Sequence, residues 1–197
     1  MKILIATNNR HKVNEIKDIL KNGIFELYTL SDLNITIEVE EDKDTLEGNS
    51  LKKAKEMFRI ANIPAIADDT GLFVDSLNGE PGVYSSRYAG EEATYDDNCV
   101  KLLRSMKGIP ERKRSAYFKT VVCIYESENK YHFFEGICKG KITTKKYGGK
   151  GFGYDPLFIP DGFEKTFAEM PEDKKNSLSH RGKAFAKAGE FLLKNYS

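Results

Sequence analysis

The segment from Ile63 to Gly90 constrains the fold most, because its apolar run ends in two adjacent carboxylates, Asp68 and Asp69, followed by Thr70 and Gly71. Two buried charges are costly unless positive groups meet them. In an extended backbone, neighbouring side chains point to opposite faces, so one carboxylate can face a site while protein donors hold the other. Chemistry in α/β folds is commonly placed where a buried strand ends. The pattern therefore indicates either a divalent cation at the pair or a turn in which both aspartates cap backbone groups.

Composition limits the class of protein. The chain has 197 residues, of which 40% are hydrophobic and 31% charged, which fits one domain with a packed core. A net charge of +1 argues against broad binding to a nucleic-acid backbone. No segment approaches the roughly 20 apolar residues of a membrane helix, and the first apolar run is too short for a signal peptide. Cys99, Cys123 and Cys138 lack a CxxC spacing, so we expect no disulfide framework, no zinc site and a reducing cytoplasm.

Hydrophobic periodicity predicts alternating strands and helices. Besides the strand that ends in the aspartate pair, strands are expected at residues 1–6, 25–30, 35–41, 115–126, 131–142 and 157–159. Helices are expected at residues 13–20, from a start signal at Asp44 and Glu47 to Asn62, from Thr94 to about Met106, and from Ser179 to about Lys194. These signals imply an α/β or α+β protein with a mixed sheet, and they leave the strand order open.

The polar turn from Thr7 to Lys12 follows the first strand and opens a helix. Its backbone N–H groups and the helix dipole can hold an anion, to which Arg10 and Lys12 add positive charge. The turn lacks the glycines of a Walker A loop or a Rossmann fingerprint. The alternative is an ordinary helix cap with surface cations.

A second candidate is the loop from Gly148 to Pro156, which has four glycines in six positions. Glycine lets a backbone approach a ligand closely. Phe152 and Tyr154 offer flat faces on which a base can stack, worth about 1–3 kcal/mol per base, and Asp155 can accept a hydrogen bond from a ring N–H. The alternative is a flexible hairpin that contributes one or two core aromatics.

The third candidate is the start of the last helix, where His180 and Arg181 follow Ser179. Cations in the first turn of a helix are disfavoured by roughly 0.3–1 kcal/mol each. A negative or carbonyl-rich ligand explains their presence, and Lys174 and Lys175 can add donors. The alternative is an exposed helix start at which the cost is tolerated.

Four stretches in this order, residues 3–16, 63–90, 148–160 and 179–185, resemble the inosine/xanthosine triphosphate pyrophosphatase family, which removes non-canonical purine nucleotides. The resemblance implies an α/β fold with a mixed sheet flanked by helices, forming a single domain of two lobes around a deep central cleft. It implies Mg²⁺-dependent hydrolysis of ITP, dITP and XTP to the monophosphate and pyrophosphate. It also implies a cytoplasmic homodimer that binds a small nucleotide, with no nucleic-acid or membrane partner.

The resemblance also implies roles for particular residues. Asp69 matches the family's catalytic, metal-associated carboxylate. The phosphate-gripping turn is matched by Thr7, Asn8, Asn9, Arg10, His11 and Lys12; the base-stacking and base-reading segment by Phe152, Gly153, Tyr154 and Asp155; and further substrate contacts by Thr70, Lys175, His180 and Arg181.

The chain departs from the family pattern in two places. Asn8 stands where the family usually has glycine, which makes the contacts of that turn less secure. Gly48 and Asn49 stand where the family often has Glu-Asn. The second metal carboxylate is therefore expected from the acidic run at residues 38–41, with Glu40 as first choice and Glu41 next.

Selectivity is expected at the purine 6-position, where donors such as Arg181, His180 and Lys175 would bond a carbonyl and repel the amino group of adenine.

Two other functions stay open at this point. A related pyrophosphatase family with a similar two-lobed fold acts on pyrimidine or modified nucleotides. A non-catalytic nucleotide sensor would bind without turnover, although such binding does not need the retained carboxylates.

Overall fold

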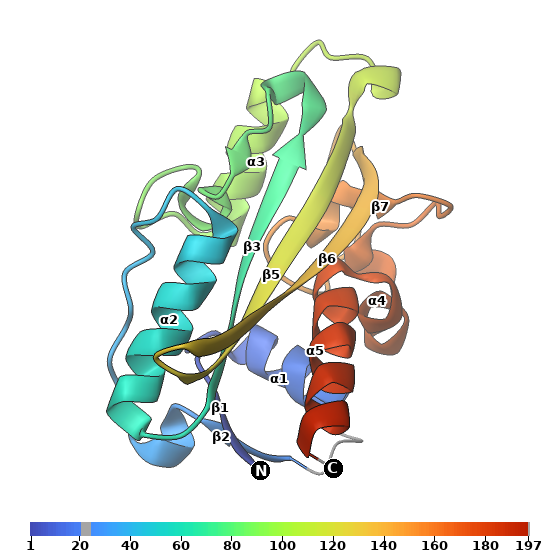
Figure 1. The fold of residues 1–197 in the computed structure, drawn as a ribbon. Coiled ribbons are helices and arrows are strands. Elements are labelled where there is room, and N and C mark those ends of the chain that lie inside the picture. The colour runs from blue at the N-terminus through green and yellow to red at the C-terminus, as the bar shows by residue number, and fades with distance from the viewer. Residues whose placement is uncertain (21–24, 197) are drawn as a thin grey trace. The chain divides into compact units, whose positions relative to one another are not determined.

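The computed structural model describes residues 1–20 and 25–196 of the chain. Its strands are β1 (Lys2–Ile5), β2 (Glu26–Thr29), β3 (Ala65–Val74), β4 (Pro81–Gly82), β5 (Ser115–Ser127), β6 (Lys130–Ile142) and β7 (Phe158–Pro160). Its α-helices are α1 (Arg10–Leu20), α2 (Leu46–Ala61), α3 (Tyr95–Ser105), α4 (Glu172–Leu178) and α5 (His180–Tyr196) (Figure 1). The sheet runs in the order β2-β1-β3-β5-β6-β7, with β4 paired to β3. Parallel pairs (β1 with β2 and β3) coexist with antiparallel pairs (β3 with β4, β6 with β7), which confirms the predicted mixed α/β fold.

The chain divides into two compact units, and each unit is built from segments that are separated along the sequence. Unit 1 comprises Met1–Asp69, Thr120–Gly136 and Arg181–Ser197, and unit 2 comprises Thr70–Lys119 and Ile137–His180. The expected single domain with a central cleft stays a prediction. In the part of the chain that the structure describes, no helix has the length and apolar character needed to cross a membrane.

Unit 1 owes its two hydrophobic layers to the alternation of β1. Ile3 and Ile5 belong to a buried cluster with residues of α1 and α5, whereas Leu4, on the opposite face, belongs to a cluster with residues of α2. A Cβ at Gly189 of α5 would lie 3.1 Å from Cδ2 of Leu20, so the missing side chain lets α1 and α5 pack closely. Figure 1 shows these two helices side by side.

In unit 2 the buried guanidinium of Arg114 ties the C-terminal end of α3 to the end of β6. Its Nη1 donates to the carbonyls of Met106 (3.0 Å) and Ile109 (3.3 Å). Its Nε donates to the carbonyl of Ile142 (2.8 Å), and its Nη2 donates to that of Thr143 (2.7 Å). Carbonyls at a helix C-terminus lack intrahelical donors, so this side chain stabilises the end of α3.

Most predicted elements are confirmed, but the strand expected at 35–41 is wrong. Residues 35–43 form neither helix nor strand. Ile35 and Val39 pack against the cluster that contains Ala54 and Met57 of α2, while Ile37 is 51% exposed. Only two of the three alternating apolar side chains are therefore packed, and they contact a cluster of helix and strand residues from a segment that is not part of the sheet.

The sequence suggested that the aspartate pair ends a strand, and this is wrong, because β3 continues to Val74. Gly71 is not in a turn: a Cβ there would lie 2.6 Å from the carbonyl oxygen of Gly82, so glycine is needed for β4 to approach. Two local details also differ. The cap of α2 is Thr45, whose side chain accepts from the N–H of Gly48, rather than Asp44, and α4 was not expected.

Candidate active site

In unit 1, the alternation of β3 gives the two adjacent aspartates different partners. Asp68 is 2% exposed, and its Oδ2 lies 3.1 Å from Nζ of Lys12 and accepts from Nε of Arg181 at 3.3 Å. Arg181 is itself 2% exposed and donates from Nη1 to Glu15 at 2.6 Å. This cluster is a buried network of alternating charges.

Asp69 meets a second network, built by α2. Its Oδ2 accepts from Nδ2 of Asn49 at 3.0 Å, and its Oδ1 lies 3.7 Å from Nζ of Lys53. The same Lys53 ammonium forms an ion pair with Glu41. Asn49 also accepts from the N–H of Lys43 at 2.9 Å, so one buried amide connects the loop before α2 to Asp69.

The two networks shift the carboxyl pKa values in opposite directions. Burial opposes ionisation of Asp68, but Lys12 and Arg181 outweigh it and hold the pKa of Asp68 well below its usual range. For Asp69, burial raises the pKa and the neighbouring Glu41 adds to the rise, so that Lys53 only partly offsets them. Asp68 is therefore a fixed counter-ion, whereas Asp69 is the better proton acceptor and the carboxylate that gains most from another cation.

Of the two glutamates considered for the second carboxylate, Glu41 is the one that shares an ion-pair partner with Asp69. Glu40 is exposed, whereas Glu41 is half-buried and shares Lys53 with Asp69. Gly48 explains how the loop reaches this position: a Cβ there would lie 2.8 Å from Cβ of Lys43. A glutamate at position 48 has no room while the loop packs in this way.

The residues present fit a magnesium ion better than a metal held by protein ligands alone. Among residues 1–20 and 25–196, no three or more His, Cys, Asp or Glu side chains group in a way that could hold a metal. Mg²⁺ usually takes only one or two carboxylates and fills its other positions with water and phosphate. Asp69 and Glu41 are two such carboxylates, and both face the same positive charge, the Lys53 ammonium.

The first turn of α1 is capped by the side chain of Asn9, the residue just before the helix. Oδ1 of Asn9 accepts from the N–H groups of His11 (3.0 Å) and Lys12 (3.3 Å), so two of the N–H groups expected to grip phosphate already have an acceptor. Asn9 in turn donates from its N–H to Oγ1 of Thr7 at 3.2 Å. Asn8 is not among the described non-glycine residues with positive φ, so this turn does not require glycine there. Asn8, Arg10 and His11 are exposed.

In unit 2 the glycine-rich loop is organised by Asp155. Its Oδ2 accepts from the N–H of Phe152 at 2.9 Å and from Nζ of Lys175 at 2.7 Å. The Lys175 ammonium also lies 4.7 Å from the centre of the Phe152 ring, a cation–π contact. A Cβ at Gly151 would lie 2.1 Å from Oδ2 of Asp155, and its φ is +76°, so only glycine suits this position.

Two other candidates for base contact in unit 2, Tyr154 and His180, are buried. Tyr154 is 5% exposed and donates from its hydroxyl to the carbonyl of Ser85 at 2.8 Å, so its ring packs in the core. His180 is 4% exposed and stacks on Phe118, with ring centres 4.4 Å apart. The exposed helix start considered from the sequence is therefore excluded. Thr70 is half-buried, and Gly153 accepts from Sγ of Cys99.

The structure thus groups the candidates by unit. Unit 1 holds Thr7, Asn8, Asn9, Arg10, His11, Lys12, Glu40, Asp69 and Arg181, and unit 2 holds Thr70, Phe152, Gly153, Tyr154, Asp155, Lys175 and His180. Sequence analysis missed Asn49, Lys53 and Glu15. Asn49 and Lys53 are four residues apart, which places them on one face of α2, and this spacing is a signal that could have identified them.

The cysteines offer no nucleophile. All three are free thiols and buried. Burial raises the pKa of Cys99 to about 11 and that of Cys123 to about 12, which keeps both protonated and unreactive.

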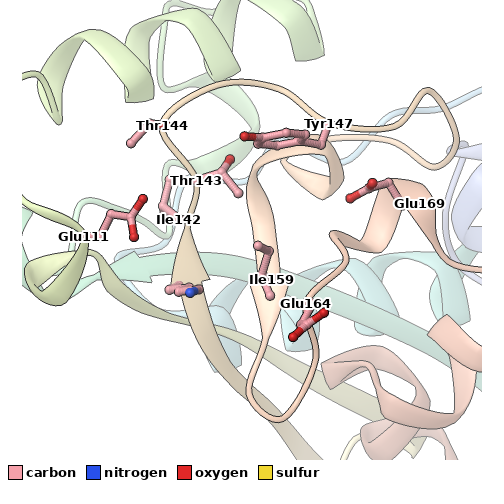
Figure 2. A pocket seen from close by; sticks show the side chains of 9 residues that line it. Glu111, Ile142, Thr143, Thr144, Tyr147, Ile159, Glu164 and Glu169 are labelled. Carbon is pink, nitrogen blue, oxygen red and sulfur yellow. The ribbon is translucent and has the colours of Figure 1, made fainter.

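A separate cavity of about 280 Å³ lies within unit 2 and holds none of the candidate residues (Figure 2). Its lining includes three glutamates, Glu111, Glu164 and Glu169. Glu169 already accepts from the N–H of Thr166 at 2.9 Å, which serves a local helix cap. The chemistry of the candidate site lies elsewhere.

Comparison with known proteins identifies relatives across the whole chain. Residues 3–191 match the model of the Ham1 family. A dITP/XTP pyrophosphatase of Thermoanaerobacter pseudethanolicus is 48% identical over 98% of both chains, and one of Flavobacterium johnsoniae is 48% identical over 93% of this chain and 94% of its own. The solved HAM1 protein from Coxiella burnetii has a TM-score of 0.90 at 33% identity, and covers 98% of this chain and 99% of its own. The Staphylococcus aureus Ham1 protein has a TM-score of 0.86 at 37% identity over 98% of both.

We expect Asp68→Asn to destabilise the protein, because it removes the counter-charge of Lys12 and one of the two carboxylates that pair with the buried Arg181. Breaking a buried pair costs about 3–5 kcal/mol, which lowers the Tm by roughly 6–20 °C in a chain of this size. Thermal unfolding followed by circular dichroism measures the change. Asp18→Asn, on the exposed face of α1, is the matched control and should keep the wild-type Tm. Equal Tm values for the two variants would contradict the role assigned to Asp68.

Proposed function

The chain belongs to the Ham1 family, and from this premise we propose that it hydrolyses the non-canonical purine triphosphates ITP, dITP and XTP to the monophosphate and pyrophosphate. The relatives named dITP/XTP pyrophosphatase, 48% identical over nearly the whole chain, support this substrate class. The observation that carries the proposal is the Asp69–Lys53–Glu41 network, in which a buried carboxylate of raised pKa adjoins a second carboxylate. The cytoplasm and a homodimeric state belong to the same proposal, and rest on the family resemblance.

Asp69 and Glu41 would hold Mg²⁺, which when bound would neutralise phosphate oxygens and the developing charge of the leaving group. In the reaction, the oxygen of a water molecule bonds to the α-phosphorus, and the bond from that phosphorus to the bridging oxygen breaks. Asp69 accepts the proton of the water, and Asn49 keeps the carboxylate in orientation through Oδ2. Pyrophosphate leaves with the bridging oxygen.

The cations of unit 1 are proposed to bind the phosphates. Lys12 lies at the start of α1, where the helix dipole also favours anions, and its side chain is 15% exposed. Asp68 holds the Lys12 ammonium, so the charge is in place before substrate arrives. Arg181, which was expected to contact the base, is reassigned in this proposal to the support of Asp68, because it is buried against Asp68 and Glu15.

The loop of unit 2 is proposed to recognise the base. Phe152 offers a ring for stacking, and the Lys175 ammonium is held by Asp155 beside that ring. Lysine can only donate hydrogen bonds, so it suits the 6-carbonyl of hypoxanthine or xanthine and opposes the 6-amino group of adenine.

The proposal is tested by pyrophosphate release from ITP, dITP, XTP, GTP, ATP and a pyrimidine triphosphate, with and without Mg²⁺. We expect turnover of the first three only, lost when the metal is removed by chelation. Asp69→Asn should lower kcat by at least about 100-fold, because the proton acceptor is lost, while the protein stays folded by circular dichroism. Turnover by Asp69→Asn near the wild-type rate would remove Asp69 from the mechanism, and preferred turnover of the pyrimidine nucleotide would overturn the substrate class.

Two adjacent glutamates provide a matched pair that tests the metal site. Glu41→Gln should lower kcat/KM by about 10- to 100-fold and raise the Mg²⁺ concentration needed for half-maximal activity, because a metal ligand is weakened. Glu40→Gln, one residue earlier and exposed, should behave as wild type. If Glu40→Gln had the larger effect on kcat/KM and on the Mg²⁺ requirement, Glu40 rather than Glu41 would be the metal ligand.

Two adjacent lysines provide a pair that tests base recognition. Lys175→Met should lower kcat/KM for dITP by about 10-fold or more, because it removes the donor proposed for the 6-carbonyl. Lys174→Met, exposed on the same helix, should leave this value unchanged. Steady-state kinetics with dITP and dATP measures both effects, and an unchanged preference for dITP in Lys175→Met would exclude the role.

A further inference from the structure

Tyr95 places an exposed aromatic ring beside the glycine-rich loop of unit 2. It is the first residue of α3 and is 43% exposed. Its ring centre lies 5.9 Å from that of Phe152, and the two ring planes meet at 45°. The helix start does not need this side chain, because Thr94 and Asp97 already form a complete capping box.

The first turns of α3 hold the loop at further points. Asp96 forms an ion pair with Lys146, just before the loop, and Sγ of Cys99 donates to the carbonyl of Gly153 at 3.3 Å. The helix and the loop are thus joined on both sides of Phe152 along the sequence. The spacing of the Tyr95 and Phe152 rings is therefore set by packed elements rather than by the loop alone.

The angle between the two rings determines what they can hold. Rings at 45° cannot both lie flat on one base, but a base stacked on one ring directs its edge toward the other. Edge-to-face and offset arrangements are the geometries that aromatic groups favour. The Lys175 ammonium occupies a position over the Phe152 ring, which adds a charged donor to the same corner.

We propose that Tyr95 is a base-contacting residue, which with Phe152 forms an aromatic corner that holds the purine and contributes to substrate affinity. The inference rests on the proposed function, since the base is that of the proposed nucleotide substrate. It adds a contact from α3, an element to which no role in substrate binding was assigned.

A fluorescence experiment tests the contact directly, because the chain contains no tryptophan. Tyr95→Trp introduces a single tryptophan at the corner. Titration with dIMP should quench its emission through contact with the base, whereas pyrophosphate alone should not. Tyr131→Trp is the control: Tyr131 lies on β6 in unit 1 and is 43% exposed, as Tyr95 is, but its ring stacks on that of Tyr125, so its emission should not respond to dIMP.

Kinetics provides the second measurement. Tyr95→Ala should raise the KM for dITP about two- to tenfold, the range expected for one aromatic contact, with kcat within about twofold of wild type. Tyr95→Phe should restore the KM, because the ring carries the contact. The proposal requires both the quench and the rise in KM, and the absence of either overturns it. If wild type releases no pyrophosphate from any nucleotide, the proposed function fails, and the dIMP titration then decides the base contact by itself.

Discussion

The burial of two adjacent carboxylates in the middle of β3 is the constraint on which unit 1 depends. Two such charges repel each other and lose their water, so each needs its own positive partner. The alternation of the strand provides a solution, because it turns Asp68 toward α1 and α5 and Asp69 toward α2. The first network holds Asp68 ionised, whereas the second leaves Asp69 with a raised pKa.

Helix α2 turns that local solution into a candidate site. Asn49 and Lys53 lie one turn apart on it, and both contact Asp69. Each also reaches the preceding loop, Asn49 through the backbone of Lys43 and Lys53 through Glu41. The loop has no strand partner, so these contacts, with the close approach at Gly48, determine where Glu41 lies. The position of a second carboxylate beside Asp69 is therefore a consequence of the Asn49 and Lys53 side chains of α2.

The sequence predicts most of the fold, because periodicity and capping are local signals. The capping box at Thr94 and the apolar spacing of α3 identify that helix without further information. The strand expected at 35–41 is wrong because an alternating apolar pattern does not show which neighbours its side chains will have: Ile35 and Val39 pack against a buried cluster, whereas Ile37 between them is 51% exposed. The sequence does not separate Glu40 from Glu41 for a related reason: which of two adjacent side chains turns inward depends on the irregular backbone of the loop, and no periodic signal determines it.

Base recognition in the proposed function depends on a charge that is paired before substrate binds. Oδ2 of Asp155 accepts from both the Phe152 N–H and the Lys175 ammonium, so one atom positions the stacking ring and the donor together. Pairing lowers the cost of burying the ammonium, and all three of its protons are donors. A hydroxyl or an amide can exchange donor and acceptor roles to suit either a carbonyl or an amino group, whereas an ammonium cannot. In the proposed function, a buried lysine held in this way would therefore give discrimination at the purine 6-position that a neutral polar side chain would not provide.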